Sequence, residues 1–253
     1  MEGGLGNLLF QVAAGVKFAQ VAGVECKLSK KFWIPNRHST TDYFSSVFSK
    51  FPLWTQDYLI QKGILRLCEP PDFRNHPDYV DIIRKVNTVG QSNVVLYGYF
   101  QNHNFVPARF KHMITLPIVD SSRVKDTCFL HIRGGDYVNH WLHDVKLSEY
   151  YKASVAHMKS LGIVKFSVFT NDKSHALQQE FLKDIEYEFV DAPEIESLVL
   201  MSECRAGITA NSSFSWWGAY LNPSRPICMP SKWFNTDFDT TGYYFPGVTV
   251  IEE

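Results

Sequence analysis

A histidine, an arginine and an aspartate lie close together in the segment His131-Ile-Arg133-Gly134-Gly135-Asp136. In a strand, His131 and Arg133 would share one face, and the glycine pair would allow a turn that delivers Asp136 just beyond the strand end. A guanidinium is permanently charged and presents a planar fork of donors. It therefore suits a diphosphate whose negative charge grows as a bond to it breaks. A structural Arg–Asp pair at a strand end explains the local pattern equally well.

A second polar segment, Asn211-Ser212-Ser213-Phe214, stands directly before a helical pattern. Hydroxyl groups and free backbone N–H groups at the start of a helix form a site for an anion. We therefore expect these four residues to contact a ligand, with simple N-capping as the other interpretation. The two tryptophans that follow, Trp216 and Trp217, are expected to pack in the core.

A glycine-rich segment, Gly3-Gly4-Leu5-Gly6-Asn7, precedes another helical pattern at residues 7–20. Such a segment lets a ligand approach the backbone closely, so Gly4, Gly6 and Asn7 are candidate substrate contacts. A tight turn explains the glycines nearly as well.

The sequence offers no pattern for a metal or a bound cofactor. Its nine histidines lack metal-binding spacing. Asp237-Phe-Asp239, the only Asp-x-Asp, does not follow a predicted strand. We expect no metal and no other cofactor.

Strands and helices are predicted to alternate beyond Asp120, which indicates a parallel, doubly wound sheet. In such a sheet, ligands bind beyond the carboxyl ends of the strands. Asn171 and Asp172 follow one predicted strand, and we expect them to converge with Arg133 and Asn211. The expected strands are 128–133, 165–170, 187–190, 206–210 and 226–229, and the expected helices are 148–161, 174–182, 194–204 and one capped near 211–213.

The chain has 253 residues, which is enough to hold these strands and helices, and its formal net charge is -1. This charge disfavours a nucleic-acid partner. Five dispersed cysteines suggest reduced core thiols. No apolar stretch reaches the roughly 18 to 20 residues of a membrane span, so we expect no transmembrane segment. We expect a cytoplasmic protein, or the soluble catalytic domain of an anchored enzyme, and leave peripheral membrane association open. A strand is expected at residues 93–100 and a domain junction at 117–125, dividing the chain into 1–120 and 121–253.

Four motifs occur in this order along the chain: Gly3-Gly-Leu-Gly-Asn7 with Phe10-Gln11, Tyr97-Gly-Tyr-Phe-Gln101, His131-Ile-Arg-Gly-Gly-Asp-Tyr137 and Ala210-Asn-Ser-Ser-Phe-Ser-Trp-Trp-Gly-Ala219. Together they resemble the α-1,2-fucosyltransferase family, and the resemblance spans nearly the whole chain. The motif at 210–219 is highly specific, and Ser148-Glu-Tyr-Tyr151 and Leu200-Met-Ser-Glu-Cys204 also fit the family.

The resemblance implies an α/β fold of the GT-B type, with two Rossmann-like lobes, parallel sheets and a crevice between them. It implies inverting, metal-independent transfer of L-fucose from GDP-fucose to a hydroxyl of a galactose-terminated glycan, with O2 of the galactose as the expected hydroxyl. Residues 121–253 would hold the donor, and residues 1–120 would mostly shape the acceptor site. Arg133 would contact the β-phosphate, His131 and Asp136 would lie beside the reacting sugar, and Ser212, Ser213 and Phe214 would lie near the nucleotide. Asp136 is the candidate base and His143 its alternative.

Two departures from the family pattern carry expectations of their own. Gly134 replaces the second arginine of the motif, so weaker donor binding is expected, and an arginine restored there should strengthen it if the loop has room. The sequence starts at the glycine-rich segment, so one strand fewer is expected in the first lobe. The alternatives are therefore a nucleotide-sugar-binding protein without turnover and a fucosyltransferase with another sugar acceptor. An NAD-type dehydrogenase is disfavoured because the dinucleotide glycine fingerprint is missing.

Overall fold

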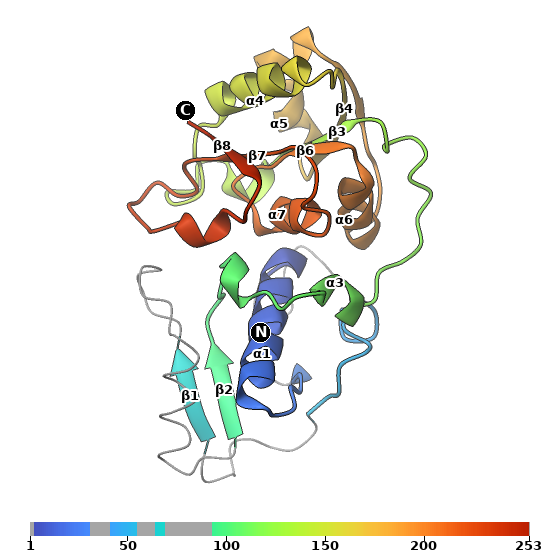
Figure 1. The fold of residues 1–253 in the computed structure, drawn as a ribbon. Coiled ribbons are helices and arrows are strands. Elements are labelled where there is room, and N and C mark those ends of the chain that lie inside the picture. Colours follow the sequence, from blue (N-terminus) through green and yellow to red (C-terminus); the bar gives the residue numbers. More distant parts are fainter. Residues whose placement is uncertain (1–2, 31–40, 55–63, 69–92, 253) are drawn as a thin grey trace. The chain divides into compact units, whose positions relative to one another are not determined.

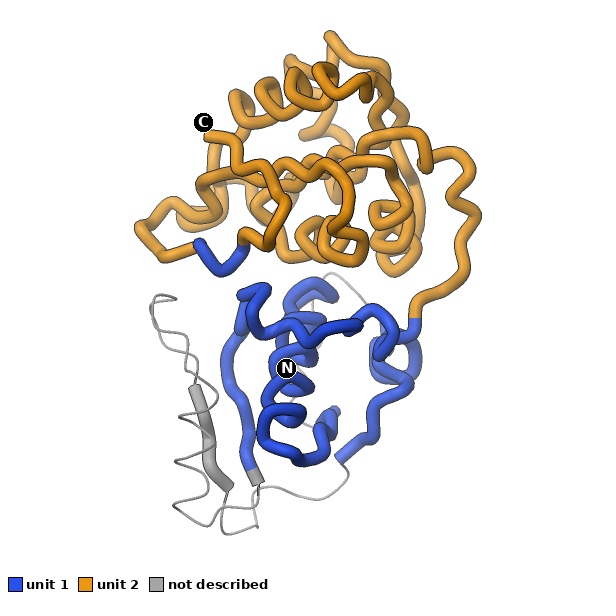
Figure 2. Tube along the Cα trace, viewed as in Figure 1, with its two compact units in different colours: residues 1–115, 241–243 blue, residues 116–240, 244–253 orange. Residues whose placement is uncertain are grey.

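The computed structural model describes residues 3–30, 41–54, 64–68 and 93–252 (Figure 1). The chain forms two compact units (Figure 2). The first comprises residues 1–115 together with 241–243, and the second comprises residues 116–240 together with 244–253. The chain leaves the first unit just before the junction expected at 117–125, and its later return at 241–243 was not predicted.

The first unit contains a long helix, α1 (Leu5–Ala22), and a parallel pair of strands, β1 (Ile64–Cys68) and β2 (Asn93–Tyr97). Gly23 ends α1 in the left-handed conformation, at φ 67°, and donates its N–H to the Ala19 carbonyl. Helix α1 is long and apolar enough to cross a membrane by length and composition, but 61% of it is buried inside the structure, as in a core helix. Two short helices follow β2, namely η4 (His103–Phe105) and α3 (Phe110–Met113).

The second unit is built on a six-stranded sheet in which each strand runs parallel to its neighbours, in the order β5-β4-β3-β6-β7-β8. The first strand in the sequence, β3, thus lies in the middle of the sheet. The next two, β4 and β5, extend the sheet to one edge, and β6, β7 and β8 extend it to the other. The predicted parallel α/β architecture is confirmed. The strands are β3 (Cys128–Ile132), β4 (Lys165–Thr170), β5 (Glu186–Phe189), β6 (Ala206–Ile208), β7 (Ile227–Pro230) and β8 (Val248–Ile251).

Helices cover both faces of this sheet, which explains why every residue of β3 is buried (Figure 1). One face packs against α4 (Ser148–Ser160), α5 (Lys173–Leu177) and the 3-10 helix η6 (Glu180–Asp184). The other lies against α6 (Glu194–Glu203) and α7 (Ser213–Tyr220) (Figure 1). Leu130 packs in the apolar core between the sheet and α4, whereas its neighbour His131 points to the ring of Phe214 on α7.

Several expected elements differ in detail from those observed. Ser148 is the first residue of α4 rather than its cap, which is Leu147. The helix expected at 174–182 is divided into α5 and η6, and strand β8 was missed. Trp216 and Trp217 are fully buried, as predicted. Four cysteines are free, and three of them are buried, namely Cys128, Cys204 and Cys228; the side chain of Cys68 lies outside the described part of the chain.

Candidate active site

The candidate site lies where β3 and β6 are neighbours in the sheet although their chain connections diverge. The helix after β3 covers one face and the helix after β6 covers the other (Figure 1). In doubly wound sheets, ligands bind beyond the carboxyl ends of strands at such a switch point. Leu130 and Ile208 are partners across this strand pair. The segments that follow the two strands, 133–137 and 209–213, are those that the sequence marked as polar.

Arg133 is held between a carboxylate and an aromatic ring. Its Nη2 donates to Asp136 Oδ1 at 2.7 Å, and its guanidinium lies 5.0 Å from the ring centroid of Tyr137. Its Nε is buried without a hydrogen-bond partner. A buried donor without a partner costs free energy, which an anionic ligand at this point would recover.

The loop after Arg133 is supported by the two polar residues that follow β4. Asn171 Oδ1 accepts the Gly134 N–H at 2.9 Å, and Asp172 Oδ2 accepts the Gly135 N–H at 3.2 Å. Asp172 Oδ1 also accepts the N–H of His175 and so caps α5. In this structure, the two side chains therefore hold the loop in shape, and their direct contact with a substrate stays a prediction.

A side chain at Gly134 would collide with this support. A Cβ built there lies 2.8 Å from Asp172 Cβ and 3.0 Å from His175 Cβ. An arginine at position 134 was expected to strengthen donor binding only if the loop has room for it, and in this conformation the loop has no such room. Glycine at 134 thus fits a loop packed closely against the start of α5.

His131 is buried at the end of β3, 3% exposed, with its ring centroid 6.0 Å from that of Phe214. Its Nδ1 has no hydrogen-bond partner. Burial, together with the nearby Arg133 charge, lowers the pKa of His131 to about 3. At neutral pH this imidazole is therefore uncharged, and it can offer an N–H donor or a lone pair but no cation.

A stack of rings continues from Arg133 into the turn that follows, residues 138–144. Tyr137 stacks on His143, with centroids 4.7 Å apart and planes 18° apart, and His143 lies 4.7 Å from His140. Burial, and secondarily His140, lowers the pKa of His143 below its usual 6.5. His140 Nδ1 accepts the backbone N–H groups of Leu142 and His143 at 3.2 and 3.3 Å. These two bonds require His140 Nδ1 to be unprotonated.

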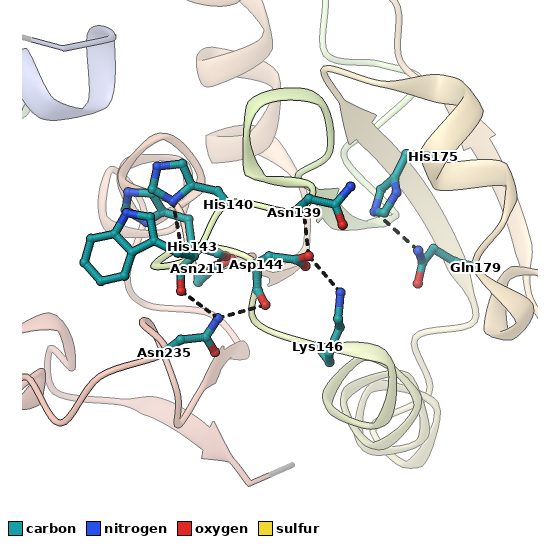
Figure 3. A network of polar contacts seen from close by, with 10 residues as sticks. Asn139, His140, His143, Asp144, Lys146, His175, Gln179, Asn211 and Asn235 are labelled. Carbon is teal, nitrogen blue, oxygen red and sulfur yellow. Dashed lines mark hydrogen bonds and ion pairs between the residues drawn. The ribbon is translucent and has the colours of Figure 1, made fainter.

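Two asparagines fasten this turn to the rest of the unit (Figure 3). Asn211 Nδ2 donates to the carbonyls of His143 and Trp233, both at 3.0 Å. Asn235 Nδ2 donates to the carbonyl of Asp144 at 3.1 Å, and the Asn235 N–H binds that of Leu142. Asn211, predicted as a substrate contact, is thus a buried support of the turn.

A pocket of about 80 Å³ opens beside this turn. Its lining carries the side chains of Arg133, His143, Lys146 and His175, which provide cationic or hydrogen-bonding groups. Lys146 is paired with Asp144 and Arg133 with Asp136. Arg133 keeps a further donor, its Nε, without a hydrogen-bond partner, so this guanidinium gives the pocket its capacity to bind an anion.

The start of α7 faces this cluster. Ser212 is buried in the N-cap position without capping the helix through its side chain, and its hydroxyl instead bonds with that of Tyr137. Ser213 begins the helix and is partly exposed, as is Phe214. The structure thus brings Ser212 and Phe214 to Tyr137 and His131, as expected for one site.

Two tyrosines of α4 fix the strand ends that carry the site, although the sequence suggested no role for them. The Tyr151 hydroxyl donates to the His131 carbonyl at 2.9 Å. The Tyr150 hydroxyl lies within hydrogen-bonding distance of the carbonyls of Thr209 and Cys228, at 2.8 and 3.0 Å. The signal was present in the Ser148-Glu-Tyr-Tyr151 motif, since a paired tyrosine on a buried helix face needs partners for both hydroxyls.

The remaining predicted contacts belong to the first unit. Gly4 is the N-cap of α1, Gly6 lies in its first turn, and Asn7 follows. Asn7 Oδ1 accepts the side-chain N–H of Gln101 at 2.7 Å, and Gln101 Oε1 accepts the Tyr243 hydroxyl at 2.5 Å. The first two family-like motifs are thus joined to each other within this unit. Whether Gly4, Gly6 or Asn7 contacts a substrate stays a prediction.

Within residues 3–30, 41–54, 64–68 and 93–252, no group of three or more His, Cys, Asp or Glu side chains is arranged to hold a metal ion. The groups at the switch point are a guanidinium, a carboxylate and two imidazoles whose pKa values are lowered by burial. This set can stabilise a leaving anion and accept a proton.

Known proteins resemble parts of this sequence. Two relatives come from Escherichia coli. The O-antigen biosynthesis glycosyltransferase WbnK is 34% identical over 120 residues, 43% of this chain and 39% of that protein. An alpha-1,2-colitosyltransferase is 28% identical over 176 residues, 61% of each. The chain thus spans less than two thirds of either relative.

Two crystal structures of POFUT1 in complex with GDP align with TM-scores of 0.47 and 0.49, at 11% and 14% identity. They cover 87% and 89% of this chain, and 92% and 95% of the POFUT1 chains. Residues 94–246 match the family model of glycosyl transferase family 11, which thereby covers more than half of the sequence. The resemblance drawn from the motifs is confirmed at this level: the chain belongs to glycosyl transferase family 11.

Proposed function

We propose that this protein transfers L-fucose from GDP-fucose to a hydroxyl of a terminal galactose, with inversion and without a metal ion. The observation that carries the proposal is Arg133 at the switch point, with Asp136 and His143 close by, in a chain of glycosyl transferase family 11. An acceptor oxygen would attack C1 of fucose while the bond from C1 to the β-phosphate oxygen breaks. GDP leaves with the bonding electrons, and the proton of the acceptor passes to a base.

Arg133 is suited to the leaving diphosphate. Its guanidinium is permanently charged, and Asp136 and Tyr137 fix its orientation while its Nε remains without a partner. Preorganised donors of this kind stabilise the transition state more than the ground state, because charge accumulates on the leaving group only as the bond breaks.

Two residues compete for the role of base. Asp136 is close to Arg133, whereas burial lowers the pKa of His143 and so favours the neutral form that can accept a proton. Replacing the base should reduce kcat by about 10² to 10⁴. We therefore expect one of Asp136→Asn and His143→Gln to lose turnover while GDP binding, measured by calorimetry, persists. Equal and mild losses in both variants would place the base elsewhere.

The choice of sugars draws on the motif resemblance and on the relatives. One relative is named as an alpha-1,2-colitosyltransferase, which supports a deoxy-sugar donor and an α-1,2 linkage and makes a colitose-bearing nucleotide sugar the second candidate donor. Another is named for O-antigen biosynthesis, which supports a glycan acceptor.

The decisive experiment is incubation of the protein with GDP-fucose and lactose or related galactosides, with mass detection of one added deoxyhexose. Transfer in the presence of EDTA supports the proposal, and loss restored by manganese would require a metal-based donor site. No transfer to any galactoside refutes the acceptor, and GDP binding without transfer to any sugar would favour a nucleotide-sugar-binding protein. Absence of GDP binding would contradict both proposals.

A further inference from the structure

One large aromatic side chain beside the candidate site is open to solvent. Trp141 is 72% exposed, whereas Trp216, Trp217 and Trp233 are at most 2% exposed. Exposing an indole forgoes the free energy of burying a large apolar surface. A tryptophan held in this state on a binding turn is therefore a candidate for ligand contact.

Trp141 lies at the outer end of the ring stack that begins at Arg133. The series runs through Tyr137, His143 and His140, and His140 is stacked with Trp141 at a centroid distance of 6.2 Å and an interplanar angle of 22°. The stack thus connects the proposed leaving-group end of the site, through a candidate base, to an open aromatic ring.

The backbone beneath Trp141 is fixed. The Trp141 carbonyl accepts Asn235 Nδ2 at 3.3 Å. Just after it in the chain, the carbonyls of Leu142 and Asp144 accept hydrogen bonds from Asn235, and the Asp144 N–H donates to the His140 carbonyl at 2.9 Å. An exposed ring on so constrained a turn loses little conformational entropy when a ligand settles on it.

We infer that Trp141 is the platform on which the acceptor sugar stacks. The attacking hydroxyl must lie at the base, and His143 belongs to the same turn as Trp141, with His140 between their rings. Galactose suits an indole because its axial O4 leaves several C–H groups together on one apolar face of the ring. This inference rests on the proposed function and adds to it a residue that determines acceptor specificity.

The kinetic test compares Trp141→Ala and Trp141→Phe with the wild type, using GDP-fucose and lactose. We expect the alanine variant to raise the KM for lactose about tenfold, with kcat at saturating lactose and the Kd for GDP unchanged. The phenylalanine variant should recover part of the loss, because it keeps a smaller aromatic face. Ile118→Ala, which also truncates a fully exposed apolar side chain, should leave the KM for lactose unchanged.

A binding test separates failure of this inference from failure of the proposed function. The indole N–H signal of Trp141, assigned by its loss in Trp141→Phe, should shift when lactose is added to the GDP complex and should not shift with GDP alone. A shift produced by GDP alone, or an unchanged KM in Trp141→Ala, would overturn the inference by assigning the ring to the nucleotide or to no ligand. If the wild type transfers no fucose to galactosides, the proposed function fails, and the lactose titration still decides whether Trp141 binds the sugar.

Discussion

Mild acid should destabilise the second unit through His131, the buried imidazole at the end of β3. Burial and Arg133 lower its pKa from 6.5 to about 3, so between these pH values the unfolded chain binds a proton that the folded chain does not. Stability is then fully present above pH 6.5 and is lost as the pH falls toward 3. At pH 4.5 the loss covers about two pKa units at roughly 1.36 kcal/mol each, which is about 3 kcal/mol.

The measurement is urea-induced unfolding of the wild type and His131→Gln at pH 7.5 and pH 4.5. Fluorescence of the buried Trp216, Trp217 and Trp233 reports on the second unit. Glutamine keeps a polar side chain but cannot titrate, and all other titrating groups are shared, so the difference between the two pH dependences isolates His131. The variant should lose about 3 kcal/mol less than the wild type on acidification. Equal losses would refute a buried, uncharged imidazole at this position.

Three further predictions follow from the packing of the second unit. Arg133→Ala should lower kcat about 10²- to 10³-fold with an unchanged Tm, and Arg133→Lys should not restore it because a point charge lacks the bidentate fork; near-normal turnover in the alanine variant would move the donor site elsewhere. Gly134→Arg should lower Tm and weaken GDP binding measured by calorimetry, since its Cβ would meet Asp172 at 2.8 Å; tighter GDP binding would show that the loop rearranges. Gly207→Ala should destabilise the unit by about 1 to 3 kcal/mol in urea melts, because a methyl group there overlaps the ring of Phe129; an unchanged midpoint would mean that the ring moves aside at little cost.

The parallel sheet could be predicted because its strands are short apolar runs that end in polar or glycine residues. Strand β4 has the predicted bounds, and β3 ends one residue earlier than expected because Arg133 turns toward Asp136. Strand β8 was missed because its four residues, Val248–Ile251, follow an aromatic segment and have no helix after them to mark the alternation. The helix predicted over 174–182 is interrupted because Gln179 leaves the helical conformation before η6 begins.

The candidate site was predicted as a set of residues but not as a set of partners. Sequence spacing placed Arg133 and Asp136 together, and the ion pair bears this out. The functions of Asn171 and Asn211 as supports depend on backbone groups far along the chain, which no local pattern indicates. The ring stack through His140 was missed for the same reason, since it forms only when the whole turn has folded.

The segment Thr241–Tyr243 belongs to the first unit although it follows nearly all of the second. Tyr243 and its partner Gln101 are separated by 142 positions in the chain. During synthesis from the N-terminus, the first unit therefore lacks one of its own pieces until the strands β3 to β7 have been made. Cutting the chain once, after Thr115, would likewise yield a first fragment deprived of Tyr243, so the two units cannot be obtained intact by a single cleavage.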